Sequence, residues 1–214
     1  MWALKAAGLK YAYPGLELFN DLDLKLRSGE ARAILGPSGS GKTTLVHLLA
    51  GILKPSAGQI WWGDLEITQL SEEKLARLRR SQVGLIFQHH YLLNELNALE
   101  NVMVPGLISG VPDQRRGLEL LAAVGLESKA KLLPVNLSGG ERQRIAVARA
   151  LYAKPRIILA DEPTGSLDRA NAELVRDLLT KLARESESAI IFATHDSALV
   201  KDWPIWRLEN GRLV

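Results

Sequence analysis

The chain has 214 residues, enough for one sizeable domain and too few for two large ones. Its formal charge of +3 comes from 27 basic and 24 acidic side chains mixed along the sequence, which argues against a nucleic-acid partner. There are no cysteines, which excludes disulfides and thiolate chemistry, and neither a membrane-spanning apolar run nor a signal-peptide layout is present, so we expect a cytoplasmic protein.

The stretch from Leu4 to Leu35 has the pattern of β-strands separated by turns. Leucines alternate with polar residues on both sides of Asn20 and Asp21, as in an antiparallel pair of strands with one buried face. These leucines are Leu16, Leu18, Leu22, Leu24 and Leu26. A shorter apolar run, Ala31 to Leu35, predicts a strand that leads directly into the next motif.

The motif after that strand, Gly36 to Thr43, reads GPSGSGKT and precedes a helix-like run from Thr44 to Gly51. Its glycines allow the tight turn that points backbone N–H groups at a polyphosphate. Lys42 can reach the outer phosphates, the Thr43 hydroxyl can ligate a magnesium ion, and the helix adds its positive N-terminal end. A simple glycine-rich turn would explain a lone GxG but not the whole motif. We therefore predict a nucleoside triphosphate bound by Gly36, Pro37, Ser38, Gly39, Ser40, Gly41, Lys42, Thr43 and Thr44.

The alternation of strands and helices continues after this motif. Gly58 to Asp64 predicts a strand, and Ser71 predicts the N-cap of a helix with acidic residues in its first turn. Val83 to Phe87 predicts a short strand that stops at Gln88. Two arginine pairs are interpreted as solvated helix faces: Arg79–Arg80 and Arg115–Arg116.

Between about His89 and Leu137 the pattern changes to helical segments, which predicts an inserted helical lobe. Three prolines are expected to break these segments: Pro105, Pro112 and Pro134. Strand and helix alternation resumes after the lobe, with a helix from Ser138 to about Tyr152, a strand Arg156–Ala160, a helix Asn171–Glu185 and a strand Ser188–Ala193. Near the end, Asn210 and Gly211 lie between apolar stretches and predict a two-residue hairpin.

These elements predict an α/β fold with a P-loop NTPase core and a mostly parallel sheet. We expect one domain over residues 1–214, in which 1–88 and 138–214 form the catalytic core. The core includes an N-terminal antiparallel β subdomain, and residues 89–137 form the inserted helical subdomain.

Two acidic residues follow the most apolar of the predicted strands. Ile157 to Ala160 has the continuous apolar character of a strand buried on both faces, and it ends in Asp161 and Glu162. Ligands of open parallel sheets bind at the carboxyl ends of the strands. We therefore predict that Asp161 holds magnesium, usually through water, and that Glu162 polarises an attacking water. Two acids opening the turn at Pro163 are the structural alternative, which the phosphate loop in the same chain disfavours.

A second candidate anion site lies at the start of another predicted helix. Ser138, Gly139 and Gly140 precede Glu141, and Ser138 with Glu141 matches a capping box. A simple cap has no need for the two glycines. Two helix ends suited to phosphate, separated by a lobe, suggest that each serves a different nucleotide.

The order of these motifs resembles the nucleotide-binding subunit of ABC transporters over essentially the whole chain. The motifs are the phosphate loop, Gln88 after a strand, LSGGERQR at 137–144, IILADEPTGSLD at 157–168 and FATHD at 192–196. Residues 96–102 and 160–168 resemble the branch that includes bacterial lipoprotein-release, macrolide-export and cell-division ATPases.

The resemblance implies roles for further residues. Gln88 would contact magnesium and sense a transmembrane partner, and Ser138, Gly139 and Gly140 would contact the γ-phosphate of ATP bound to a second copy. Asp168 would lie in a loop that crosses the dimer interface, and His195 would lie near the γ-phosphate. Tyr13, which precedes Pro14, fits best as the aromatic residue that stacks on adenine, with Tyr11 as the alternative.

The function implied is ATP hydrolysis with magnesium as cofactor, in which Glu162, His195 and Lys42 are catalytic. The expected assembly is a homodimer formed on ATP binding, peripheral at the inner face of the cell membrane and attached to integral membrane permease subunits. An ATP-driven regulatory module that gates a membrane partner without moving cargo is the alternative. A nucleotide kinase would leave Ser138 to Gln143 and His195 unexplained.

Overall fold

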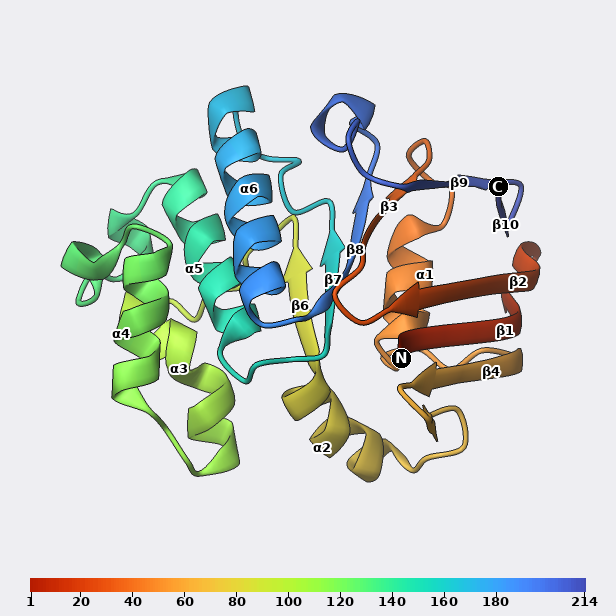
Figure 1. Cartoon of the computed structure of the whole chain (residues 1–214), viewed down its shortest axis with the longest axis horizontal. Helices are drawn as coiled ribbons and strands as arrows, with labels where there is room; N and C mark the ends of the chain where they lie inside the picture. The colour runs from red at the N-terminus through yellow and green to blue at the C-terminus, as the bar shows by residue number, and fades with distance from the viewer.

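The computed structural model describes residues 1–214 and contains two sheets with six α-helices (Figure 1). In chain order the strands and α-helices are β1 (Trp2–Tyr13), β2 (Leu16–Arg27), β3 (Ala31–Leu35), α1 (Lys42–Leu49), β4 (Ala57–Trp62), β5 (Leu65–Glu66), α2 (Glu72–Gln82), β6 (Val83–Phe87), α3 (Ala98–Ser109), α4 (Gln114–Ala123), α5 (Gly139–Leu151), β7 (Ile157–Asp161), α6 (Arg169–Glu185), β8 (Ala189–Thr194), β9 (Ile205–Glu209) and β10 (Arg212–Leu213). Short 3₁₀ turns lie at Glu127–Lys129, Pro134–Asn136 and Ser197–Leu199. No helix combines the length and apolar character that crossing a bilayer requires.

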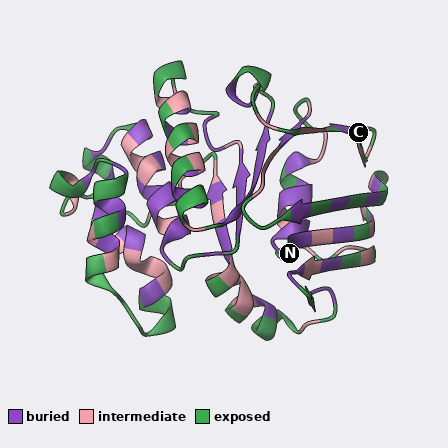
Figure 2. Ribbon diagram, in the orientation of Figure 1, coloured by how far each residue is buried: buried purple, intermediate pink, exposed green.

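The central sheet has the strand order β10-β9-β3-β8-β7-β6. All neighbouring pairs from β9 to β6 are parallel, and only β10 pairs antiparallel, through the predicted hairpin at Asn210 and Gly211. The strands β7 and β8 are buried along their whole length (Figure 2). The prediction of an α/β fold with a mostly parallel sheet is confirmed.

Two hydrophobic cores lie on opposite faces of this sheet, as the alternation along β7 shows. Ile158 and Ala160 join the core with α5, α6 and the helical lobe, whereas Ile157 and Leu159 join the core with α1 and the small sheet. The small antiparallel sheet has the order β2-β1-β4-β5, and α1 lies between it and the central sheet (Figure 1). Packing on both faces explains why the central strands carry continuous apolar runs.

The strand β2 contains a bulge that the leucine pattern did not predict. The register with β1 shifts between the pairs Leu9–Leu22 and Tyr11–Phe19, so β2 has one extra residue there, and Asp21 has a positive φ of 69°. An extra residue moves all later positions to the other face of a sheet. Phe19 is therefore buried, whereas Leu16 is 58% exposed, and the prediction that the five leucines share one buried face is wrong.

The helical lobe contains α3 and α4, and one of its prolines does not break a helix. Pro112 precedes α4 and Pro134 opens a 3₁₀ turn, as predicted, but Pro105 lies inside α3. A proline within a helix removes one backbone hydrogen bond. Burial of Val102 and Gly106 on the same helix offsets this loss, so α3 continues to its left-handed C-cap residue.

Two arginines of helix α2 are hydrogen-bonded to other parts of the fold and are not simply solvated. The Arg79 side chain is only 21% exposed and donates a hydrogen bond to the Gly51 carbonyl at 2.6 Å, while Arg80 donates to the Ile108 carbonyl at 3.0 Å. The interpretation of this pair as solvated is wrong, because both guanidinium groups bind carbonyl groups of other elements. Ser71 occupies the N-cap position of α2, but its side chain makes no capping hydrogen bond.

Asn101 ties the segment that follows Gln88 to the lobe. This residue is fully buried, its Oδ1 accepts from the Leu93 N–H at 2.8 Å, and its Nδ2 lies 2.8–3.1 Å from the carbonyls of Leu93, Leu96 and Asn97. Replacing it with alanine leaves these backbone groups without partners in the interior. We predict that Asn101→Ala lowers the free energy of unfolding by about 3 kcal/mol, measured by chemical denaturation.

The matched control is Asn136→Ala, because Asn136 is exposed. Its expected change is within about 0.5 kcal/mol, as for most surface substitutions. Equal effects of the two substitutions would contradict the role of Asn101.

Candidate nucleotide-binding site

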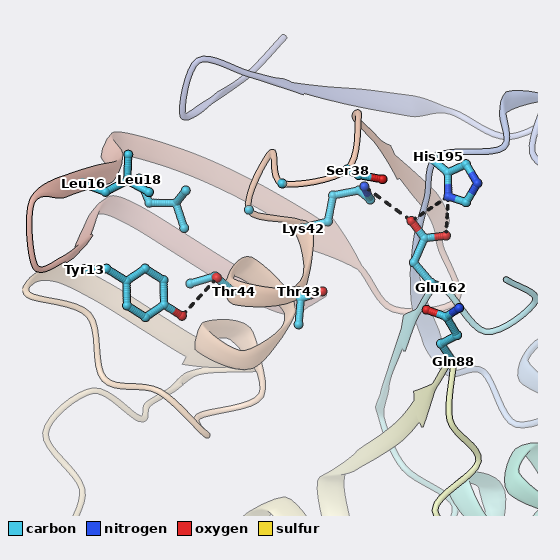
Figure 3. Close-up of a pocket in the computed structure, with 12 residues that line it drawn as sticks. Tyr13, Leu16, Leu18, Ser38, Lys42, Thr43, Thr44, Gln88, Glu162 and His195 are labelled. Carbon is cyan, nitrogen blue, oxygen red and sulfur yellow. Dashed lines mark hydrogen bonds and ion pairs between the residues drawn. The ribbon is translucent and has the colours of Figure 1, made fainter.

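A cavity of about 460 Å³ opens beside the phosphate loop, between α1 and the carboxyl ends of the central strands (Figure 3). It is lined by Tyr13, Leu16, Leu18, Ser38, Gly39, Gly41, Lys42, Thr43, Thr44, Gln88, Glu162 and His195. All of these except Leu16 and Leu18 are sequence-predicted site residues. The cavity thus collects residues from five separate stretches of the chain.

The phosphate loop connects the buried end of β3 to the first turn of α1. Gly39 and Gly41 have positive φ values of 80° and 99°, which side chains other than glycine rarely adopt. At Gly41 a Cβ atom would also lie 3.0–3.1 Å from the side chains of Leu18 and Phe19 on β2. The loop therefore depends on glycine both for its turn and for its contact with the small sheet.

Lys42 is the one charged residue of the loop, and only 6% of its side chain is exposed. Its Nζ donates to the carbonyls of Gly36 at 2.8 Å and Pro37 at 3.1 Å, and it lies 3.4 Å from Oε1 of Glu162. The ammonium group thus lies between the loop and the end of β7. A cation in this position can stabilise negative charge on a bound phosphate.

Glu162 follows β7 in a left-handed backbone conformation, with φ of 45°. Its backbone N–H donates to the Ala193 carbonyl at 2.9 Å, and its carboxylate lies 3.0 Å from Nδ1 of His195. The Thr194 hydroxyl donates to the same carboxylate at 3.3 Å. Since an ionised carboxylate only accepts hydrogen bonds, Nδ1 of His195 carries the proton. The carboxylate is thus oriented toward the cavity by groups on β8 and by Lys42.

Asp161 ends β7 and is buried, and its Oδ1 has no hydrogen-bond partner. Burial raises the pKa of this carboxyl group, and a hydrogen bond from Thr43 partly offsets the effect. A buried carboxylate oxygen without a partner, beside a hydroxyl, fits a hard cation such as magnesium. The residues that can hold magnesium are Thr43, Gln88 and Asp161.

Tyr13 lies at the opposite end of the cavity from Glu162 (Figure 3). Tyr13 is 44% exposed, and its hydroxyl is 3.4 Å from Oγ1 of Thr44. Tyr11 does not line the cavity but packs edge-on against Tyr13, with ring centroids 5.2 Å apart. The structure therefore favours Tyr13 over Tyr11 as the stacking residue.

Leu16 and Leu18 are the site residues that the sequence did not reveal. Both lie on β2 before the bulge and line the cavity; Leu16 is turned away from the core, whereas Leu18 also packs against it. They add apolar surface near Tyr13, where a base would stack. The polar pair Asn20 and Asp21 inside a leucine pattern is the signal that could have indicated the bulge.

Several predicted residues lie outside the cavity. Pro37 and Ser40 line a neighbouring hollow with the β9–β10 turn, and Gly36 is held so closely that a Cβ atom would lie 2.6 Å from Oγ of Ser40. Asp168 is the N-cap of α6 and accepts from the Asn171 N–H at 2.9 Å. This hydrogen bond lowers the pKa of the Asp168 carboxyl group.

Ser138, Gly139 and Gly140 also lie outside the cavity, at the N-terminus of α5. The capping box is confirmed, since Oγ of Ser138 accepts from the Glu141 N–H at 3.3 Å and Oε2 of Glu141 accepts from the Ser138 N–H at 2.9 Å. A Cβ atom at Gly140 would lie 2.6 Å from Oδ1 of Asn171, so packing against α6 explains this glycine. At Gly139 the nearest atom, on Leu167, is 3.9 Å away. Nothing within the chain requires a glycine at position 139.

The fold and the cavity together define a P-loop nucleoside triphosphatase. The family model described as "ABC transporter" matches residues 19–165, more than half of the chain. The lipoprotein-releasing system ATP-binding protein LolD of Idiomarina loihiensis is 46% identical over 200 residues, covering 92% of this chain and 88% of that relative. LolD of Legionella pneumophila strain Paris is 44% identical over 189 residues, covering 87% and 83%.

Among solved structures, the dimeric ATP-binding cassette MJ0796 bound to ADP and Pi is similar with a TM-score of 0.89 and 33% identity. The similarity covers 98% of this chain and 96% of that one. The chain belongs to the ABC transporter family. It is an ATP-binding subunit that hydrolyses ATP with magnesium.

The position of Tyr13 gives a prediction for nucleotide affinity. Stacking of a base on an aromatic ring contributes about 1–3 kcal/mol, so Tyr13→Ala should weaken binding of a non-hydrolysable ATP analogue by about 5- to 150-fold. Tyr11→Ala should have a smaller effect, because Tyr11 acts only through Tyr13. Titration calorimetry measures both, and a larger loss for Tyr11→Ala would contradict this assignment.

Proposed function

We propose that two copies of the chain close around two ATP–magnesium complexes and that this closure drives integral membrane permease subunits. The system is of the export or lipoprotein-release type, and the chain is peripheral at the inner face of the cell membrane. The names of the relatives, a lipoprotein-releasing system ATP-binding protein, support the type of system. The dimeric state of the cassette MJ0796 supports the pairing of subunits.

The observation that carries this proposal is the separation of the two phosphate-binding motifs. The cavity at Lys42 receives no lining residue from Ser138 to Gly140. A Cβ atom at Gly139 would meet no closer contact than Leu167 at 3.9 Å, so this glycine is suited to an approach from outside the chain. Asp168 lies next to this motif through its contact with Asn171. We therefore propose that Ser138, Gly139, Gly140 and Asp168 complete the nucleotide site of the partner copy.

The proposed chemistry is an in-line attack of water on the terminal phosphate. Glu162 orients and activates the water as general base, while Lys42 and His195 stabilise the charge that develops on the phosphate. Thr43, Gln88 and Asp161 would hold a magnesium ion, which would supply positive charge to the phosphate oxygens. The helical subdomain at 89–137 connects Gln88 to the membrane partner.

The variant Glu162→Gln tests this function. An amide keeps the shape of the side chain but cannot accept the proton, so the hydrolysis rate should fall by about a hundredfold or more. ATP binding should remain, and the unhydrolysed nucleotide should hold two subunits together. Analytical ultracentrifugation with ATP and magnesium should therefore detect a dimer that is absent without nucleotide.

The matched control is Glu185→Gln, an exposed residue at the end of α6, which should hydrolyse ATP at the wild-type rate. Adding Ser138→Arg to Glu162→Gln should abolish the dimer while leaving ATP binding intact. A double variant that still dimerises with ATP would remove Ser138 from the proposed interface.

A further inference from the structure

The segment that follows β6 is bonded to helix α5 at several points. The Gln143 side chain, which is fully buried, donates from Nε2 to the Phe87 carbonyl at 3.0 Å. Arg149 donates to the carbonyls of His90 at 2.5 Å and Tyr91 at 2.6 Å. Gln88 lies within this bonded segment, so its backbone is held by the same helix whose N-terminus carries Ser138.

The His90 side chain also connects this segment to α5. Its Nε2 lies 2.9 Å from Nε of Arg142, and its Nδ1 lies 3.2 Å from Oε1 of Gln143. An arginine only donates, so Nε2 must accept. The Gln143 amide nitrogen already donates to the Phe87 carbonyl, so its oxygen faces His90 and Nδ1 must donate. The imidazole is therefore neutral, with its proton on Nδ1.

The same arginine also binds the chain directly before Ser138. Its NH1 group donates to the Leu137 carbonyl at 2.5 Å and lies 3.5 Å from the Pro134 carbonyl. A continuous chain of hydrogen bonds thus runs from His90, two residues after Gln88, through Arg142 to the backbone that leads into Ser138. The neighbouring His89 has no such role: it is exposed, and its ring only packs edge-on against Tyr91.

We infer that His90 is a positioning residue that fixes the Gln88 segment to the Ser138–Gly140 end of α5, so that both move as one body. This inference rests on the proposed function. When Gln88 contacts the nucleotide in its own cavity, Ser138 is then placed at the same time against the nucleotide of the partner copy. Without the link, each copy can bind ATP in its own cavity but presents Ser138 less often in the position needed for turnover.

Steady-state ATP hydrolysis by the full chain tests the inference. His90→Ala removes the acceptor of Arg142 and the donor to Gln143, and kcat per folded molecule should fall about tenfold, while KM changes by no more than about twofold. His90→Gln should restore most of kcat, because its carbonyl oxygen can accept from Arg142 and its amide can donate to Gln143. The matched control, His89→Ala, should keep both constants.

A merely structural role predicts a different result. His90→Ala would then lower the melting temperature but leave kcat per folded molecule unchanged, and His90→Gln would not differ from it in kcat. Either result overturns the inference.

A second measurement does not depend on hydrolysis. Nitrogen NMR of the histidine rings in the wild-type chain without nucleotide should show a neutral His90 with its proton on Nδ1. A proton on Nε2 would break the link to Arg142 and overturn the inference, even if His90→Ala fails to fold. If His90 has the expected tautomer but the chain does not dimerise with ATP, the result contradicts the proposed function and not this inference.

Discussion

The site depends on the register of four parallel strands. Leu35 of β3 lies beside Thr194 of β8, and Asp161 of β7 lies between Ala193 of β8 and Phe87 of β6. These strands end at the same edge of the sheet, so the residues that follow them meet there: Gly36, Gln88, Glu162 and His195. Ligand sites of open parallel sheets form at this edge. A shift of one strand would separate Glu162 from Lys42 and His195.

The charges at this edge explain why the site suits a nucleotide with magnesium. Lys42 and His195 lie on two sides of the Glu162 carboxylate, and the buried Asp161 keeps one oxygen without a partner. An unpartnered buried carboxylate oxygen is costly unless an ion or ligand satisfies it. The chain also carries Ser138 to Gly140, the motif proposed to contact phosphate, and its own cavity does not include them. Each feature indicates a site that is completed from outside the chain, by a nucleotide and by a second subunit.

Local sequence patterns predicted much of this structure. Features that depend on contacts between residues far apart in the sequence were not predicted. The phosphate loop, the apolar strand before Asp161 and the capping box at Ser138 are each specified by neighbouring residues, and all lie as expected. The bulge at Asp21 depends on how β2 pairs with β1, so Leu16 and Leu18 were assigned to the core. The hydrogen bond from Arg79 to the Gly51 carbonyl and the one between Arg142 and His90 join residues at least 28 positions apart, which no local pattern encodes. The preference for Tyr13 over Tyr11 as the proposed stacking residue likewise needed the position of the cavity.

The most direct test of the shared site uses the absence of cysteine in the chain. One preparation carries Ser38→Cys in the phosphate loop and another carries Ser138→Cys at the start of α5, both with Glu162→Gln to retain ATP. The two are mixed and oxidised with and without ATP and magnesium. The expected result is a disulfide between one copy of each variant that forms only with nucleotide. No cross-link with ATP, or equal cross-linking without it, would contradict a nucleotide site shared between two subunits.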